Sequence, residues 1–341
     1  MKILGKNPSG SHKVKVQQST HFIDGAFKNI VETAMMAKDA TPIAMLKDLL
    51  NPPANRAPSL VIPSVKTDLY QTSSDKPVIT WFGHSSYHIS VAGKKILVDP
   101  VFSGNASPFT FMIKSFAGSD IYKPADFKDI DVLILTHDHY DHLDYKTLVQ
   151  LKDKVKFVCC SLGVASHLTH WGFDKKKITE LDWWQSAKFE NLKLTATPAR
   201  HFSGRMIKRG QTLWSAFVLE VNEYQLFLGG DSGYGDHFRE IGKRFGGFDI
   251  AILECGQYNT KWPMIHMMPE ETVQANIDLQ SKVLMPVHWG KFALAFHPWN
   301  EPASRAIDRA KQLSIKYTVP KIGESIIVGD TLKVEEWWKV G

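Results

Sequence analysis

Short runs of apolar residues recur along most of the chain, and each is bounded by glycine, proline or charged residues. Runs of this length, rich in β-branched and aromatic side chains, predict buried β-strands. We expect strands at residues 78–82, 87–91, 95–98, 132–135, 155–160, 192–197, 214–221, 224–228, 250–253 and 283–287. Longer stretches with helical patterning lie between several of these runs and predict helices at 143–152, 164–171 and 270–279.

The N-terminal part has a different pattern and is predicted to form an arm and connector, residues 1–76, ahead of a main domain, residues 77–341. Residues 1–20 are polar and rich in lysine, so we expect little order there. Apolar side chains within 27–35 follow the i, i+3, i+4, i+7, i+8 spacing of an amphipathic helix. A second apolar group covers 43–50, and the proline- and serine-rich residues 52–76 favour an extended connector.

The arm has two interpretations. It packs on the main domain, which the spacing alone favours, or it exposes an apolar patch that contacts a membrane or a second copy in a homodimer. Met35, Met36 and Met45 would give such a patch an adaptable surface. Residues 102–116 are also too apolar for a solvated loop, so they are expected to enter the core or to line a substrate groove.

Composition narrows the class of protein. With 341 residues and 43% hydrophobic composition, the chain can bury a large core. Its net charge of +6 comes without a dense run of arginine, lysine and aromatic residues, so nucleic-acid binding is not expected. Three cysteines are too few for a disulfide scaffold, and no stretch reaches the roughly 18 apolar residues of a membrane span. We therefore expect a cytoplasmic protein, at most peripheral to a membrane.

Candidate chemistry is concentrated immediately after the apolar run 132–135. Three histidines and an aspartate occur there in the pattern His137-x-His139-x-Asp141-His142. Imidazole and carboxylate together suit zinc, and iron or manganese less exclusively. His137 and His139 can share one metal ion while Asp141 and His142 turn toward a second. Two ions are therefore implied, and further ligands are needed from other parts of the chain.

The missing ligands are expected just past other strands. His201 follows 192–197, Asp231 follows the hairpin 214–228, and His288 follows 283–287. Two glycines before Asp231 let the backbone approach closely and place this side chain at a strand end, where a bridging carboxylate belongs. By contrast, His167 and His170 lie on a predicted helix without a carboxylate partner, and we interpret them as structural.

The pattern His137-x-His139-x-Asp141-His142 resembles the signature of the metallo-β-lactamase superfamily. This resemblance implies an α/β fold, an αββα sandwich of two mixed sheets with helices outside, and a dinuclear site at one sheet edge. Asp99, after the strand 95–98, would support the metal loop from outside, and His84 either does the same or is an ordinary turn histidine. The resemblance also assigns the ligands: His137, His139 and His201 for one ion, Asp141, His142 and His288 for the other, and Asp231 as the bridge.

Further segments resemble the N-acylphosphatidylethanolamine phospholipase D family, namely residues 81–86, 197–201, 230–234, 266–271 and 288–294. This resemblance implies a phosphodiesterase with two zinc ions, in which a metal-bridging hydroxide attacks phosphorus and releases phosphatidic acid and an N-acylethanolamine. Asp141 and His266 would be the catalytic residues, with His266 at the phosphate or the leaving group. The side chains around His266, namely Trp262, Met264 and Met267, are expected to contact an acyl chain or to form a lid.

Two alternatives stay open. A sugar-phosphate lactonase, or another phosphodiesterase of small molecules, would use the same ligands, although the apolar segments argue against it. A non-catalytic metal-binding protein would be expected to lack part of the ligand set, which is complete in this chain.

Overall fold

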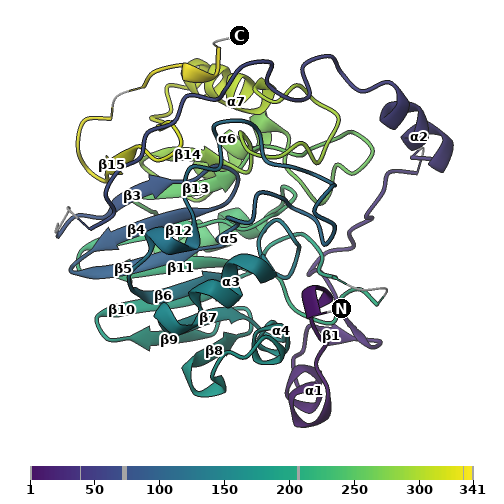
Figure 1. Ribbon diagram of the computed structural model, residues 1–341, viewed down its shortest axis with the longest axis vertical. Helices are drawn as coiled ribbons and strands as arrows, with labels where there is room; N and C mark the ends of the chain where they lie inside the picture. Colours follow the sequence, from purple (N-terminus) through teal and green to yellow (C-terminus); the bar gives the residue numbers. More distant parts are fainter. Residues whose placement is uncertain (1, 39, 71–74, 206–207, 333, 340–341) are drawn as a thin grey trace.

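Two mixed β-sheets packed face to face form the centre of the computed structural model, which describes residues 2–38, 40–70, 75–205, 208–332 and 334–339 (Figure 1). The seven-stranded sheet has the order β15-β3-β4-β5-β6-β7-β8, and the six-stranded sheet has the order β14-β13-β12-β11-β10-β9. The strands of the first sheet are β3 (Val78–Trp81), β4 (Tyr87–Val91), β5 (Lys94–Val98), β6 (Ile130–Leu135), β7 (Val155–Ser161), β8 (Ile178–Leu181) and β15 (Ser325–Ile327). Those of the second are β9 (Ser186–Phe189), β10 (Leu192–Thr197), β11 (Ala216–Val221), β12 (Tyr224–Leu228), β13 (Ile250–Glu254) and β14 (Leu284–Val287).

The strands β5 to β8 run parallel to one another, and so do β12 to β14. Parallel strands are usually buried on both faces, which explains their continuous apolar sequence. In β6, Val132 and Ile134 face the core between the two sheets. Leu133 and Leu135 join a second cluster beneath the helices on the opposite face.

Helices cover the outer faces of both sheets (Figure 1). The first outer layer, on the seven-stranded sheet, contains α3 (Tyr145–Leu151) and α4 (Ala165–His170). The second, on the six-stranded sheet, contains α5 (His237–Phe245), α6 (Pro269–Asp278) and α7 (Glu301–Gln312). Short 3-10 helices lie at Lys2–Leu4, Pro124–Asp126, Lys152–Lys154, Lys175–Lys177 and Trp337–Lys339. The predicted αββα sandwich is therefore confirmed.

The beginning of the arm packs on the main domain. Val16 of α1 (Gly10–Gln17) and Phe27 of β2 (Ala26–Phe27) are buried in one cluster with Trp183 and Trp214. Little order was expected in residues 1–20, and this expectation is wrong because α1 has partners in the main domain.

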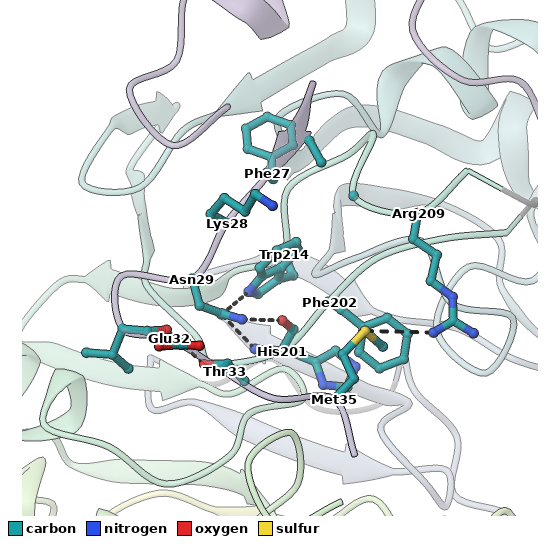
Figure 2. Close-up of a pocket in the computed structure, with 13 residues that line it drawn as sticks. Phe27, Lys28, Asn29, Glu32, Thr33, Met35, His201, Phe202, Arg209 and Trp214 are labelled. Carbon is teal, nitrogen blue, oxygen red and sulfur yellow. Dashed lines mark hydrogen bonds between the residues drawn. The ribbon is translucent and has the colours of Figure 1, made fainter. Parts of the chain in front are cut away.

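The amphipathic helix predicted over residues 27–35 does not form. Strand β2 pairs with β1 (Phe22–Ile23), and residues 28–37 then contain neither helix nor strand. Their hydrogen bonds go to distant parts of the chain: Asn29 bonds to the backbone of His201 (Figure 2), and the Ala37 N–H donates to the Lys261 carbonyl at 2.8 Å. A helix of this length has little stability of its own, so these tertiary bonds decide the conformation.

The second apolar group does form a helix, α2 (Pro42–Leu50), in which Thr41 Oγ1 accepts from the Ala44 N–H at 3.2 Å. It leaves apolar side chains in solvent: Ile43 is 81% exposed and Leu50 is 70% exposed. After α2, residues 52–70 contain no helix or strand, as predicted for the connector. The domain boundary at residue 76 stays a prediction. Among the described residues, no helix has the length and apolar character needed to cross a membrane.

The apolar segment 102–116 enters the core only in part, and a substrate groove formed by this segment stays a prediction. Phe102 and Phe116 are buried, whereas Phe109, Phe111 and Met112 are exposed at the surface.

Candidate metal centre

The loop 136–142 begins where β6 ends and is held by Asp99, which follows β5. Asp99 Oδ1 accepts from the Thr136 N–H at 2.9 Å, and Oδ2 accepts from Thr136 Oγ1 at 2.5 Å and from His142 Nδ1 at 2.8 Å. Burial raises the pKa of Asp99, although its bonds with His142 and Thr136 act in the opposite direction. Asp99 thus contacts the loop at both ends, in the place predicted for a supporting residue.

Four side chains with ligand atoms form a first group: His137, His139, His201 and Asp231, whose ligand atoms all lie within 4.8 Å of one another. His139 Nδ1 is 3.0 Å from His137 Nε2 and 3.2 Å from His201 Nε2. Asp231 Oδ2 is 3.7 Å from each of those two Nε2 atoms. On the far side of its ring, His201 Nδ1 donates to the Ile265 carbonyl at 2.8 Å, which turns Nε2 toward the group.

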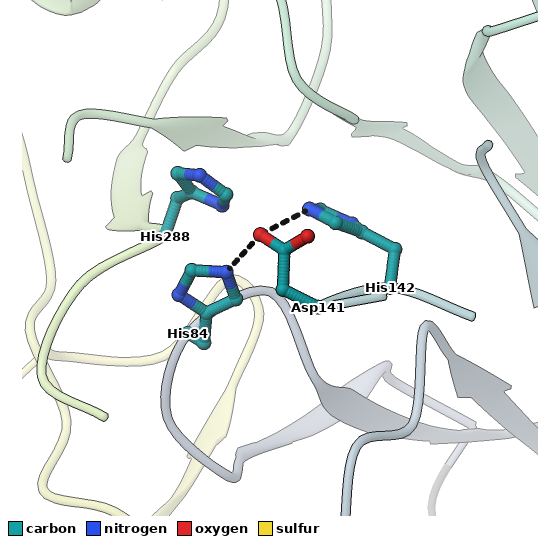
Figure 3. A group of neighbouring side chains, drawn as sticks. All are labelled: His84, Asp141, His142 and His288. Atoms are coloured by element: carbon teal, nitrogen blue, oxygen red, sulfur yellow. Dashed lines mark hydrogen bonds and ion pairs between the residues drawn. The ribbon is translucent and has the colours of Figure 1, made fainter. Parts of the chain in front are cut away.

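A second group contains His84, Asp141, His142 and His288 (Figure 3). Asp141 Oδ2 lies 2.9 Å from His84 Nε2 and 3.6 Å from His142 Nε2. His84 also exchanges backbone hydrogen bonds with the segment after β14, since the His288 N–H donates to its carbonyl at 2.9 Å. His84 therefore contacts both Asp141 and the segment that carries His288, which is the geometry expected of a residue that orients a metal ligand.

Asp231 lies between the two groups. Its Oδ2 faces the first group, while its Oδ1 is 3.1 Å from both His142 Nε2 and His288 Nδ1. The glycines before it permit this position, because a Cβ on Gly229 would meet the Ile252 carbonyl oxygen at 2.5 Å. The carboxylate thus occupies the place where a bridging ligand was predicted.

The donor set fits two metal ions. Burial lowers the pKa of His137, His201 and His288 well below the usual histidine value, so these imidazoles are neutral, the form that binds metal. Burial acts to raise the pKa of Asp231, yet His142 and His288 hold it well below the usual carboxyl value. The buried atom His288 Nε2 has no hydrogen-bond partner in the described chain, and His142 Nε2 and Asp231 Oδ1 lie 3.1 Å apart without the geometry of a hydrogen bond. Buried polar atoms without partners are costly, and cations between the groups would satisfy them.

The outer side of the loop is fixed by Asp138, whose buried carboxylate accepts from the Gly204 N–H at 2.7 Å and lies 3.2 Å from His167 Nε2. His167 also accepts a hydrogen bond from the Lys6 N–H at 3.0 Å. Within the described chain these contacts tie α4 and the N-terminus to the loop. His167 therefore has a structural role, but the expectation that it lacks a carboxylate partner is wrong, because Asp138 is that partner.

The pair formed by Glu254 and His266 adds a feature that the sequence interpretation missed. Glu254 Oε2 lies 2.8 Å from His266 Nδ1, and Oε1 accepts from the Ser232 N–H at 2.9 Å. Burial raises the pKa of Glu254 to about 7, against the effect of His266. Burial opposes charge on His266, but Glu254 and Asp231 raise its pKa to about 9. The sequence did indicate Glu254 as a candidate site residue, because it directly follows the predicted strand 250–253, as the predicted ligands follow other strands.

A cavity of about 320 Å³ opens onto the centre. Its lining combines side chains of the centre with apolar side chains such as Met35, Met36 and Leu294. It is lined by Met35, Met36, His139, Asp141, Phe202, Arg209, Asp231, Gln257, Trp262, Ile265, His266, His288 and Leu294.

Of the three predicted substrate contacts, only Trp262 lines this cavity. Met267 is fully buried in the main core just before α6, so its predicted contact with substrate is wrong. Met264 does not line the cavity either. Its backbone packs against Gly233, where a Cβ would meet the Met264 carbonyl oxygen at 1.9 Å.

The sequence matches the family described as a beta-lactamase superfamily domain over residues 94–289. Together with the sandwich and its His/Asp clusters, this match shows that the chain belongs to that superfamily of metal-dependent hydrolases.

The chain is similar to several known proteins. An uncharacterized protein of Mycobacterium tuberculosis is 36% identical over 330 residues, which cover 95% of this chain and 88% of that protein. The N-acyl-phosphatidylethanolamine-hydrolyzing phospholipase D 1 of Caenorhabditis elegans is 30% identical over 234 residues, 63% of this chain and 64% of that protein. A solved metallo hydrolase from the archaeon Ignicoccus hospitalis has a TM-score of 0.57 and 22% identity, covering 75% of this chain and 100% of that one, and shows likeness of fold.

Proposed function

We propose that this protein is a dinuclear zinc phosphodiesterase of the phospholipase D type, which cleaves phospholipids similar to N-acylphosphatidylethanolamine. The observation that carries the proposal is the cavity over the centre, where ligand-type side chains lie beside Met35, Met36, Trp262 and Leu294. Such a cavity suits a substrate with an anionic reacting group and apolar chains. The name of the Caenorhabditis elegans relative supports the same substrate class.

The donor set favours zinc, because the side chains proposed to hold the ions include five imidazoles and two carboxylates. Two zinc ions would supply an activated water molecule at neutral pH and positive charge for the phosphoryl oxygens. The residues proposed to hold them are His137, His139, Asp141, His142, His201, Asp231 and His288, with Asp99 and His84 orienting His142 and Asp141.

His266 is the protein group best placed to act on the substrate. Because its Nδ1 is bonded to Glu254, its Nε2 is left for a group in the cavity that the ring lines. From there Nε2–H can donate to a phosphoryl oxygen or give its proton to the departing alcohol. Glu254 would hold the ring in this orientation, as a carboxylate does for a catalytic histidine.

Access from a lipid surface is proposed through α2 and the exposed residues Phe109, Phe111 and Met112. A second cavity, of about 730 Å³, is lined by Leu49 of α2, by Met112 and by Leu294, and it shares Leu294 with the cavity over the metal centre. Apolar side chains therefore lead from the exposed helix to the site. We propose that the protein binds peripherally to membranes through this surface.

The proposal is tested by measuring zinc content together with turnover of a soluble ester, bis-nitrophenyl phosphate, and of N-acylphosphatidylethanolamine in vesicles. We expect close to two zinc ions per chain and faster cleavage of the lipid. Two metals with cleavage of the soluble ester alone would indicate a small-molecule phosphodiesterase instead. Sedimentation with and without vesicles separates membrane binding from a homodimer that covers α2.

A further inference from the structure

The N-terminal segment 28–37, named here the strap, runs beside His201 and Phe202 (Figure 2). At one end Asn29 contacts the loop that carries His201, and at the other the Ala37 N–H donates to the Lys261 carbonyl at 2.8 Å. Between these points Met35 reaches the cavity wall, where its Sδ lies 3.8 Å from Arg209 Nη1. The strap therefore joins the His201 loop to the segment that carries His266.

Asn29 bonds to His201 through both ends of its side-chain amide. Its Nδ2 donates to the His201 carbonyl at 2.8 Å, and its Oδ1 accepts from the His201 N–H at 3.1 Å. Trp214 Nε1 lies 3.2 Å from the same Oδ1 and also donates to the Ala199 carbonyl at 3.0 Å (Figure 2). Among the described residues, Asn29 is the hydrogen-bond partner of both backbone groups of His201.

The His201 imidazole is thus fixed from two sides. The Ile265 carbonyl holds Nδ1 of the ring, and Asn29 holds the backbone from which the ring projects. The neighbouring Arg200 is tied separately, since its Nε donates to Thr33 Oγ1 at 3.0 Å and its N–H donates to Ser232 Oγ at 2.9 Å. Anchoring of the strap and positioning of His201 therefore rest on different residues and can be tested apart.

We propose that Asn29 is a positioning residue of the metal centre, which sets the place of His201 Nε2 by fixing the backbone of that residue. This inference rests on the proposed function, in which His201 binds metal. In this proposal the N-terminal segment helps to position a metal ligand, although about 170 residues separate Asn29 from His201 in the sequence.

The test compares zinc affinity in wild-type protein, Asn29→Ala and Thr33→Val by competition with a chelator. The second variant removes the Thr33 acceptor for Arg200 Nε, while Arg200 Nη2 keeps its bond to the Glu32 carbonyl and Asn29 keeps both bonds to His201. It therefore controls for loosening of the strap. We expect Asn29→Ala to bind one of the two zinc ions about tenfold more weakly and the other unchanged. Thr33→Val should match the wild type. Cobalt-loaded samples should show an altered visible spectrum for Asn29→Ala alone, a change that general destabilisation does not produce.

Asn29→Asp provides a second variant in case the alanine protein does not fold. Its carboxylate can still accept from the His201 N–H and Trp214, but it cannot donate to the His201 carbonyl, so an intermediate loss of affinity is expected. Equal affinities and spectra in all folded proteins would overturn the inference and leave the proposed function intact. An equal loss in Thr33→Val would also overturn it, in favour of general anchoring. If the wild type binds neither zinc nor cobalt, the proposed function itself fails.

Discussion

Replacing Asp99 with asparagine is expected to weaken metal binding on the His142 side of the centre while the fold persists. Asp99 accepts three hydrogen bonds, from the Thr136 N–H, from Thr136 Oγ1 and from His142 Nδ1. Asparagine has nearly the same shape, and it tolerates the left-handed backbone that Asp99 adopts, with φ of 40°. The change therefore alters charge and acceptors more than packing.

The size of the effect follows from these bonds. An asparagine that keeps its oxygen toward Thr136 Oγ1 and His142 must point its NH₂ group at the Thr136 N–H, where two donors then meet. One hydrogen bond to a charged group is lost, which is worth about 1.5–3 kcal/mol. That corresponds to roughly 10- to 150-fold in an equilibrium constant. Loss of partners that orient metal ligands costs about 10- to 100-fold in affinity, the same range.

The assay is a titration of Asp99→Asn with zinc against a competing chelator, with thermal unfolding of the metal-free protein measured in parallel. Asp131→Asn is a suitable control, because Asp131 Oδ2 accepts from the Lys95 N–H at 2.9 Å in the same sheet and is remote from the centre. We expect weaker binding of one metal ion in Asp99→Asn alone. Wild-type affinity together with a lower unfolding temperature would refute the reasoning and make Asp99 a structural residue.

Two further substitutions test other conclusions. Glu180 accepts from the Gly163 N–H at 2.7 Å and lies 2.7 Å from His12 Nε2. Burial opposes its charge, yet His12 and Lys15 lower its pKa below the usual 4.5. The stabilisation by this carboxylate is present above about pH 4.5 and is lost as the pH falls. Glu180→Gln should therefore lower the free energy of unfolding by about 1–2 kcal/mol at pH 7 and by less at pH 3. An equal difference at both pH values in thermal unfolding would contradict this. Met267→Ala should cost about 2–5 kcal/mol because Met267 is a core residue, whereas Met267→Leu should cost less than about 1.5 kcal/mol and keep KM unchanged. A raised KM for the leucine variant would restore Met267 as a substrate contact.

The sequence predicted the strands that are buried on both faces and missed those that are not. Continuous apolar runs indicated β6, β7 and β10 to within two residues of their observed ends. The edge strands β8, β9 and β15 were not predicted, because their residues are mostly half-buried or exposed. These three strands pack few apolar side chains, so their pattern does not stand out from that of a loop. Strand β14 also lies at an edge, but it is fully buried and was predicted.

The course of the arm was not predictable from local pattern. Residues 27–35 have the apolar spacing of a helix, but Ile30 and Val31 are exposed and the polar Asn29 makes the decisive contacts. These contacts are with residues far along the chain, which no window of neighbouring positions contains. Tertiary hydrogen bonds therefore outweighed a periodicity that is worth little in a short helix.

The site was predicted more completely than the arm because its residues obey one topological rule. Strands β3, β5 and β6 of the first sheet point the same way, and so do β10, β12, β13 and β14 of the second. Side chains that follow their C-terminal ends meet at one edge of the sandwich, as ligand sites do in other mixed α/β sheets. His201, Asp231 and His288 were found by this rule. Glu254 ends β13, which lies between the strands that lead to Asp231 and His288. The same rule therefore also identifies Glu254, the carboxylate that holds His266, if it is applied to every polar residue at a strand end and not only to the expected metal ligands.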